Sequence, residues 1–171
     1  MNILAMDQAR VGGWSVFDNE TKTLVDCGGY DFEREKATYA ESVDKVKCLM
    51  ADLISKYHVG MVLLEDIQFR ANAAVFKKLA WLQGVLINYC VVNNLPFWLV
   101  QPSSWQAWCR KHSDAAQRSA EVVGDRKATK VLSLNFVKEK YNMELDNDNI
   151  ADAVCIGHYG VMGEDICLET E

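Results

Sequence analysis

The sequence predicts a mixed α/β fold with a central sheet, because its predicted elements run in the order three strands, helix, strand, helix, strand and then helices. The strands are short apolar runs, and the helices carry apolar residues at three- and four-residue spacing. Three strands joined by short connections at the start of the chain indicate an antiparallel meander. A length of 171 residues is typical of one domain, so we expect residues 1–171 to form a single domain.

Five segments have the pattern of strands. Gly12 and Gly13 ease the tight connection before the second strand, and Gly28 and Gly29 interrupt the third, which indicates a bulge there. The expected strands are 2–8, 11–17, 24–32, 59–65 and 97–100.

Four segments have helical periodicity: 38–57, 71–93, 126–141 and 148–159. Pro102 offers a further helix start, with Ser103 or Ser104 as the N-cap. We expect residues 112–125 to form a loop or a weak helix, and residues 160–171 to form a frayed tail.

Composition limits the class of protein. Half of the residues are hydrophobic and a quarter are charged, which is ordinary for a soluble globular chain. No apolar stretch approaches the roughly 20 residues of a membrane span, and no basic-then-apolar leader precedes the first strand, so we expect a cytoplasmic protein without a membrane partner. None of the six cysteines forms a CxxC pair, which favours buried free thiols and gives no support for a zinc site.

The net charge of −6 is unevenly distributed along the chain. Residues 67–143 carry 11 basic and 4 acidic side chains, whereas residues 1–66 and 144–171 are acidic. The middle third therefore has the charge to line a site for a polyanion, although an excess of solvated basic side chains on helix faces would give the same count.

Three carboxylates stand where aliphatic side chains would be expected. Asp7 and Glu65 each end an apolar strand, and Asp152 lies inside an apolar helical segment. A buried acid is costly unless it is paired or holds a metal. Three such acids in one small domain predict a shared site for divalent cations.

The helix expected around Asp152 brings two further oxygen donors to the same face. Asp148 lies four residues earlier and Asn149 three residues earlier. Oxygen-only ligands select hard ions, Mg²⁺ first and Mn²⁺ second. Two such ions about 3.5–4 Å apart can clamp a phosphodiester, so we expect two ions per site.

Taken singly, the acids also have structural explanations. Asp7 could begin a turn, Asp148 could be an N-cap, and Asp66 is expected to be solvated. The histidines are assigned structural roles by default: His58, His112 and His158. Of these, His112 lies in the basic middle segment and is the one we would test.

Three stretches carry a family likeness: ILAMDQARVGGWSVFD, LLEDIQFRANAAVFKKLAWLQGVL and DNDNIADAVCIGHYG. Together they resemble the RuvC Holliday junction resolvases, and the phage-encoded branch most closely, with Asp-Gln after the first strand. The first motif alone is weak. The second, a strand-ending glutamate followed by a helix with Lys-Leu-Ala and Leu-x-Gly, is more specific, and the Ala-Asp-Ala of the third makes the set strong. The likeness spans residues 2–159.

The resemblance implies a ribonuclease H-like fold, a homodimer and Mg²⁺-dependent nicking of four-way DNA junctions. Asp7, Glu65 and Asp152 match three of the four acids of the family. The fourth position, three residues before the last aspartate, is Asn149 here. We favour Asp148 as the fourth ligand and keep Asn149 as the alternative.

The resemblance also assigns basic and aromatic side chains. Lys127 and Lys130 lie where the family has a lysine near the scissile phosphate, so we expect catalytic and DNA-binding roles for them. Lys77 and Lys78, also expected to bind DNA, open the helix that the family uses for dimerisation. Phe69 matches an aromatic that stacks on unpaired junction bases, although a core role explains it equally well. The remaining expected DNA contacts are Arg70, Arg110, Lys111, Arg118 and Arg126.

We therefore expect a crossover junction endodeoxyribonuclease, in the host cytoplasm if phage-encoded, that resolves branched DNA by paired nicks. One alternative keeps the fold and changes the substrate to RNA or an RNA–DNA hybrid. Another is a junction-binding protein without catalysis, which the departure at Asn149 favours. An actin-like ATPase ranks last, because the paired glycine-rich phosphate loops are missing.

Overall fold

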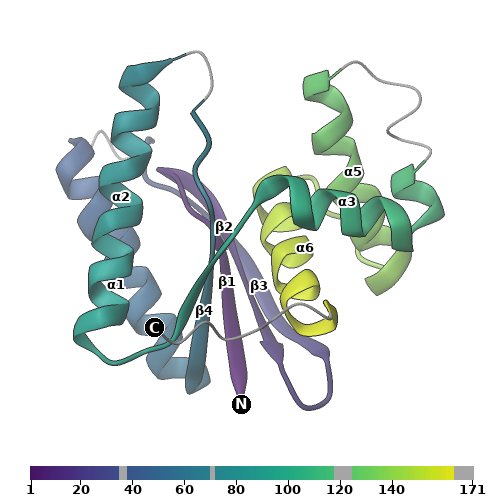
Figure 1. Ribbon diagram of the computed structural model, residues 1–171, viewed down its shortest axis with the longest axis horizontal. Helices are drawn as coiled ribbons and strands as arrows, with labels where there is room; N and C mark the ends of the chain where they lie inside the picture. The colour runs from purple at the N-terminus through teal and green to yellow at the C-terminus, as the bar shows by residue number, and fades with distance from the viewer. Residues whose placement is uncertain (35–37, 70–71, 118–124, 164–171) are drawn as a thin grey trace.

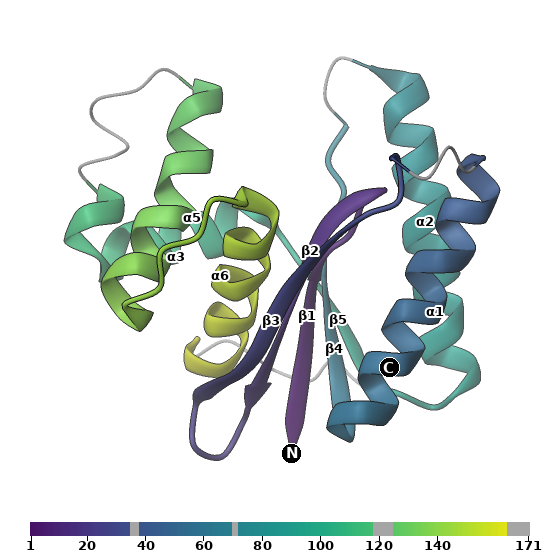
Figure 2. The ribbon, with the colours of Figure 1, turned by 180° about the vertical axis from the view of Figure 1, so that it is seen from behind.

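The computed structural model describes residues 1–34, 38–69, 72–117 and 125–163, without the side chains of residues 125–130. Its centre is a five-stranded sheet in the order β3-β2-β1-β4-β5, with helices on both faces (Figure 1, Figure 2). The strands are β1 (Asn2–Asp7), β2 (Val11–Asp18), β3 (Thr23–Asp31), β4 (Val59–Glu65) and β5 (Phe97–Val100). The predicted α/β class with a central mixed five-stranded sheet is confirmed.

The sheet combines two kinds of strand pairing. β1, β2 and β3 form an antiparallel meander, as expected, whereas β4 pairs parallel to β1 and β5 parallel to β4. Parallel neighbours need a crossover connection, and α2 (Ala73–Val92) provides it between β4 and β5. The carboxyl ends of β1, β4 and β5 therefore meet at one edge of the sheet.

The expected bulge at Gly28 and Gly29 is absent from the β2–β3 pairing, whose register instead shifts between Val16 and Phe17. Gly28 pairs regularly with Trp14, and a Cβ at Gly28 would lie 2.7 Å from the Trp14 ring. Glycine is needed there because the indole of the neighbouring strand occupies the space of a side chain.

Alternating side chains of the central strands enter two separate cores. Leu4 and Met6 of β1 pack in the core under α1 (Tyr39–Tyr57) and α2, whereas Ile3 and Ala5 pack in the core under α3 (Pro102–His112), α5 (Asp125–Tyr141) and α6 (Asp148–Met162). Figure 1 shows the two groups of helices on opposite faces of the sheet. By the same alternation, the residue after Met6 faces the α3–α5–α6 side.

Helices α1 and α2 begin at the polar caps that their sequences offer. Thr38 and Glu41 form a reciprocal capping box at the start of α1. The Asn72 side chain accepts hydrogen bonds from the backbone N–H groups of Ala74 and Val75 at the start of α2. Both caps satisfy N–H groups that have no partner within the helix.

Helix α3 begins differently from expectation. Pro102 occupies its first turn, and Gln101 is the N-cap without a side-chain hydrogen bond, so the assignment of Ser103 or Ser104 as the cap was wrong. The fixed φ of proline suits the first helical position, where its missing N–H costs nothing. The helix continues to His112, and residues 114–117 are also helical, so the described part of 112–125 agrees with the helix alternative and not with the loop.

Helix α6 runs three residues beyond its expected end at Tyr159, so residues 160–162 are not part of a tail. Residues 164–171 lie outside the description. The helix packs very closely on the sheet: a Cβ at Gly160 would lie 2.1 Å from Cδ1 of Leu63, and the Ser15 hydroxyl donates to the carbonyl of Ala153 at 2.7 Å. This close approach fixes the height of α6 above β2 and β4.

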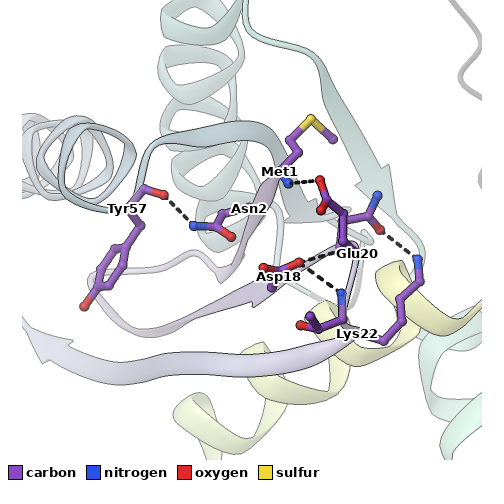
Figure 3. Close-up of polar contacts among 8 residues, drawn as sticks. Met1, Asn2, Asp18, Glu20, Lys22 and Tyr57 are labelled. Atoms are coloured by element: carbon purple, nitrogen blue, oxygen red, sulfur yellow. Dashed lines mark hydrogen bonds and ion pairs between the residues drawn. The ribbon is translucent and has the colours of Figure 1, made fainter.

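Hydrogen bonds at the opposite end of the sheet secure the start of β1 and the turn between β2 and β3 (Figure 3). The Asn2 side chain donates to the carbonyl of Tyr57 at 2.7 Å, and the Met1 ammonium lies 3.2 Å from the Glu20 carboxylate. Asp18 accepts from two backbone N–H groups of the turn. These contacts hold the amino end of β1, opposite the end that carries Asp7.

Helix α2 is the one helix among the described residues that is long and apolar enough to cross a membrane by length and composition. This finding contradicts the expectation that no stretch approaches such a length. Leu82, Leu86 and Cys90 of this helix pack in the core, whereas Trp81 and Val92 are exposed.

Candidate active site

Asp7 and Glu65 end two neighbouring parallel strands. Met6 pairs with Leu64 in the β1–β4 register, so the two acids that follow lie side by side at the edge of the sheet. Strand alternation directs both toward the α3–α5–α6 side. Both line one hollow of about 480 Å³. The structure thus brings together two of the residues predicted from the sequence.

Glu65 is anchored at its backbone and at its carboxylate. The buried Gln8 amide donates from Nε2 to the Glu65 carbonyl at 2.5 Å and accepts at Oε1 from the Glu65 N–H at 3.1 Å. This pair of bonds extends the β1–β4 ladder by one side chain. The indole Nε1–H of Trp105 donates to Oε1 of Glu65 at 3.0 Å.

Asp66 is also held by neighbouring elements, so the expectation that it is merely solvated was wrong. Its backbone N–H donates to the Val100 carbonyl at 2.8 Å. Its carboxylate accepts from the side-chain amides of Gln83, on α2, and Gln101, at the start of α3. The ends of β4 and β5, the middle of α2 and the start of α3 therefore form one polar network beside Glu65.

The first two turns of α6 carry the acids expected on that helix. Asn147, rather than Asp148, is the N-cap, because its side chain accepts from the Asn149 N–H at 3.0 Å. Asp148 and Asp152 follow one turn apart, as predicted. Oδ1 of Asp152 is buried. Close packing against β2 sets the position of this turn, since a Cβ at Gly13 would lie 2.1 Å from the Asn149 carbonyl oxygen.

Asp148 and Asn149 face a different hollow from Asp7 and Glu65. They line a second hollow of about 490 Å³ between α6 and the β2–β3 pair, together with Asp31. The structure therefore separates the two candidates for the fourth ligand from the two strand-end acids.

The donor chemistry of these residues suits a hard divalent ion, because all the donors are carboxylate or amide oxygens. The positions of these donors are less suited to binding a divalent ion. Among the residues that the structure describes, no three His, Cys, Asp or Glu side chains lie together closely enough to hold a metal ion. The predicted acids share one face of the sheet, but they are not gathered around a common point.

The negative charges of Asp7 and Asp152 raise the pKa values of buried neighbouring groups. Burial raises the pKa of the Tyr30 hydroxyl, and the nearby Asp7 carboxylate raises it further. Burial likewise raises the pKa of the Cys155 thiol, followed by smaller effects of Cys109 and Asp152. Neither hydroxyl nor thiol is ionised at neutral pH, so both contribute as neutral groups beside the acids.

Three solved structures resemble the whole chain. Thermus thermophilus RuvC in complex with Holliday junction substrate matches with a TM-score of 0.68 and 14% identity, over 95% of this chain and 97% of that one. A second T. thermophilus RuvC structure matches with a TM-score of 0.66, 14% identity and the same coverage. The yeast mitochondrial Holliday junction resolvase Ydc2 matches with a TM-score of 0.59 and 15% identity. The match covers 93% of this chain and 77% of that one.

The chain has the RuvC fold. The expected ribonuclease H-like architecture is thereby confirmed, while the likeness to the phage-encoded branch stays a prediction. No family model and no curated protein matches the sequence. At 14–15% identity, the structural likeness establishes the fold and does not establish the activity. The activity therefore has to be argued from the residues of the site.

Three of the side chains predicted to bind DNA are exposed near the candidate active site. Phe69 is 64% exposed and lies edge-on to Phe76, so a plain core role is excluded. Lys77 and Lys78 are exposed over aromatic rings, 5.2 Å from the Trp81 centroid and 5.6 Å from the Tyr39 centroid. All of these lie at or just before the start of α2, near the hollow that contains Asp7.

The remaining predicted contacts are less well placed. Lys111 is exposed at the end of α3, whereas Arg110 is half-buried, and its buried Nε has no hydrogen-bond partner among the described residues. Arg70 and Arg118 lie outside the described residues, as do the side chains of Arg126, Lys127 and Lys130 on α5. Their roles stay predictions.

The histidines keep their structural assignment where the structure describes them. Burial, assisted by the charges of Lys140 and His112, lowers the pKa of His158 to about 4. His158 contacts the Tyr141 hydroxyl inside an aromatic cluster. His112 is exposed and stacks on Trp108 with ring centroids 3.9 Å apart, so its ring is committed to packing.

Sequence reasoning missed the side chains that hold the acids. No role at the site was predicted for Trp105, and Gln8 appeared only as part of a motif. Gln8 carried a detectable signal, since a polar side chain directly after a buried strand needs a partner there. Trp105 and Gln101 carried none, because they lie 40 and 35 residues from their acidic partners.

Proposed function

We propose that the protein is a metal-dependent endonuclease that nicks branched DNA, with four-way junctions as its preferred substrate. The observation that carries this proposal is the side-by-side placement of Asp7 and Glu65 at two strand ends of a RuvC fold. The matched T. thermophilus RuvC was captured with a Holliday junction substrate, which makes branched DNA the first substrate to test.

Asp7, Glu65 and Asp152, with Asp148 or Asn149 as the fourth, are the proposed holders of two Mg²⁺ or Mn²⁺ ions. When bound, such ions offset negative charge on phosphate oxygens and lower the pKa of water. Because the described side chains are not gathered, the acids of α6 have to move toward the strand-end acids on binding. Asp148 would also have to turn from the second hollow toward Asp7.

The other residues of the site are assigned to binding and orientation. Lys127 and Lys130 belong to α5, which packs on α6, and we assign them to the phosphate beside the acids. Phe69 offers an exposed ring on which an unpaired junction base can stack. Lys77 and Lys78 provide positive charge for the backbone next to it.

The proposed enzyme is a homodimer that pairs through α2. This helix exposes Trp81 (54%), Val91 (59%) and Val92 (69%) on its outer side. A hollow of about 620 Å³ lies on the same side, lined by Trp81, Gly84 and Tyr89. Contiguous apolar surface of this kind marks protein interfaces, and two nicks on opposite strands require two sites.

Trp81→Glu is expected to weaken the dimer about 30-fold or more, because buried tryptophans carry a large share of interface energy and the new charge would be desolvated. Light scattering on a dilution series measures the effect. Val25→Glu is the matched control, since Val25 is 48% exposed on β3, the sheet edge farthest from β4 and α2. A Trp81→Glu protein that dimerises as tightly as the control would exclude α2 as the interface.

Cleavage of a labelled mobile four-way junction tests the proposed activity. We expect paired, symmetric nicks in Mg²⁺ and none in EDTA. Linear duplex and an RNA–DNA hybrid of the same sequence, assayed in parallel, should be cut at least about tenfold more slowly. Preferred cleavage of the hybrid would instead establish the ribonuclease alternative.

A non-catalytic junction binder is the second candidate, and the ungathered acids among the described residues favour it. It predicts tight, junction-selective binding with no nicking in Mg²⁺ or Mn²⁺ at any concentration. The same assay, run beside a gel shift, decides between the two.

A further inference from the structure

Trp105 is an unusual core residue because its polar atom reaches the candidate active site. It is 0% exposed and is among the largest fully buried side chains of the molecule. A buried indole N–H needs an acceptor. The acceptor is Oε1 of Glu65, 3.0 Å away, on a strand 40 residues earlier in the chain.

The indole is a rigid donor. Trp105 belongs to the tightly packed core that includes Cys109 of the same helix and Phe136 of α5. The start of α3 is tied to the end of β4 a second time, because the Gln101 amide donates to the Asp66 carboxylate. The direction of the Trp105 N–H is therefore set by the placement of a whole helix.

The backbone of Glu65 is equally fixed. Gln8 bonds to both the N–H and the carbonyl of Glu65, and Gln83 donates to the same carbonyl at 3.4 Å. A glutamate side chain has three rotatable bonds, which would otherwise let its carboxylate sample many positions. With the backbone held by Gln8 and the carboxylate held by Trp105, both ends of this short chain are pinned.

We propose that Trp105 is a positioning residue that holds the Glu65 carboxylate in one orientation beside Asp7, in the hollow that both acids line. The orientation is a property of the folded chain alone. Its consequence for catalysis rests on the proposed nuclease function: a carboxylate held in place before a cation arrives binds the cation with less reorganisation.

Trp108 offers a matched comparison on the same helix. It lies three residues further along and packs against Phe136 and His158. Among the described residues, the indole that donates a hydrogen bond to Glu65 is that of Trp105 and not that of Trp108. Trp105→Phe and Trp108→Phe remove the same atoms from two tryptophans of one core. Replacement of Trp105 by 3-benzothienylalanine goes further, because it removes the N–H and keeps the size of the ring.

The first measurement needs neither metal nor DNA. Side-chain NMR couplings of Glu65 report whether it occupies one rotamer or several. We expect a single rotamer in the wild-type protein and in Trp108→Phe, and rotamer averaging in Trp105→Phe and in the benzothienylalanine protein. Unchanged couplings in the benzothienylalanine protein would overturn the proposal, whatever the thermal stability of Trp105→Phe.

The second measurement is binding of Mn²⁺ alone, followed by electron paramagnetic resonance, with junction cleavage beside it. Loss of a partner that orients a metal ligand costs 10–100-fold in affinity or activity in known sites, so we expect a loss in that range for both Trp105 changes. Trp108→Phe should stay within about twofold of wild type. If the wild-type protein neither binds Mn²⁺ nor nicks DNA, the nuclease function fails, and the NMR couplings still decide the role of Trp105.

Discussion

Asp7→Asn is expected to lower the rate of junction cleavage by about 10³-fold or more while leaving junction binding within about twofold of wild type. The change keeps the shape of the side chain and removes its negative charge. Loss of several kcal/mol of cation-mediated charge stabilisation corresponds to a factor of ten per 1.4 kcal/mol. Binding should survive, because phosphate contacts are assigned to other side chains, including Lys77 and Lys78 on α2.

Cleavage in Mg²⁺ and gel shifts in Ca²⁺ measure the two effects separately. Asp44→Asn is the control with the same change of charge, since Asp44 is exposed on α1 and pairs with Lys47 of the same helix. It should cleave at the wild-type rate. Equal cleavage rates for Asp7→Asn and Asp44→Asn would show that Asp7 has no role in the reaction.

The strands and most helix boundaries were predictable because their causes are local. The start of α1 follows from Thr38 and Glu41, and β1 follows from an apolar run that ends at an acid. Alternation along each strand then places Asp7 and Glu65 on one side of the sheet, once β1 and β4 are known to pair in register. What the sequence left open was whether β1 and β4 are neighbours, which the parallel pairing of Met6 with Leu64 answers.

The contacts that hold the site could not be predicted, because they depend on where α3 and α6 settle on the sheet. Trp105 has an ordinary place on an amphipathic helix, and its bond to Glu65 exists only because α3 begins where β4 ends. Asp148 was the favoured fourth ligand, yet it lines the second hollow together with Asp31 and not the hollow of Asp7 and Glu65. Spacing along one helix gives a shared face and leaves its direction undetermined.

Gly13→Ala is expected to destabilise the fold by roughly 1–3 kcal/mol, which is the usual cost of overpacking. The added Cβ would lie 2.1 Å from the Asn149 carbonyl oxygen and 2.5 Å from its carbonyl carbon. These are backbone atoms in the first turn of α6, so no side-chain rotation can relieve the clash. Thermal unfolding should show a midpoint lower by roughly 3–10 °C.

Gly84→Ala is the matched control for thermal unfolding alone, because no atom of the same chain lies within 4 Å of the Cβ it would add, while Gly84 also lines the hollow on the proposed dimer face. Because Gly84 lies in the interior of α2, where alanine is favoured over glycine, we expect the substitution to leave the stability of the fold unchanged or to raise it by roughly 0.5–1 kcal/mol.

The larger effect of Gly13→Ala should be on cleavage measured well below its unfolding midpoint. Gly13 pairs with Asp7 across the β1–β2 ladder, and the turn it touches carries Asp148 and leads to Asp152. Relief of the clash must move α6 away from β2, and with it the helix acids away from Asp7. A fully folded Gly13→Ala protein that cleaves like the wild-type protein would show that the spacing between α6 and the strand ends does not matter for the reaction.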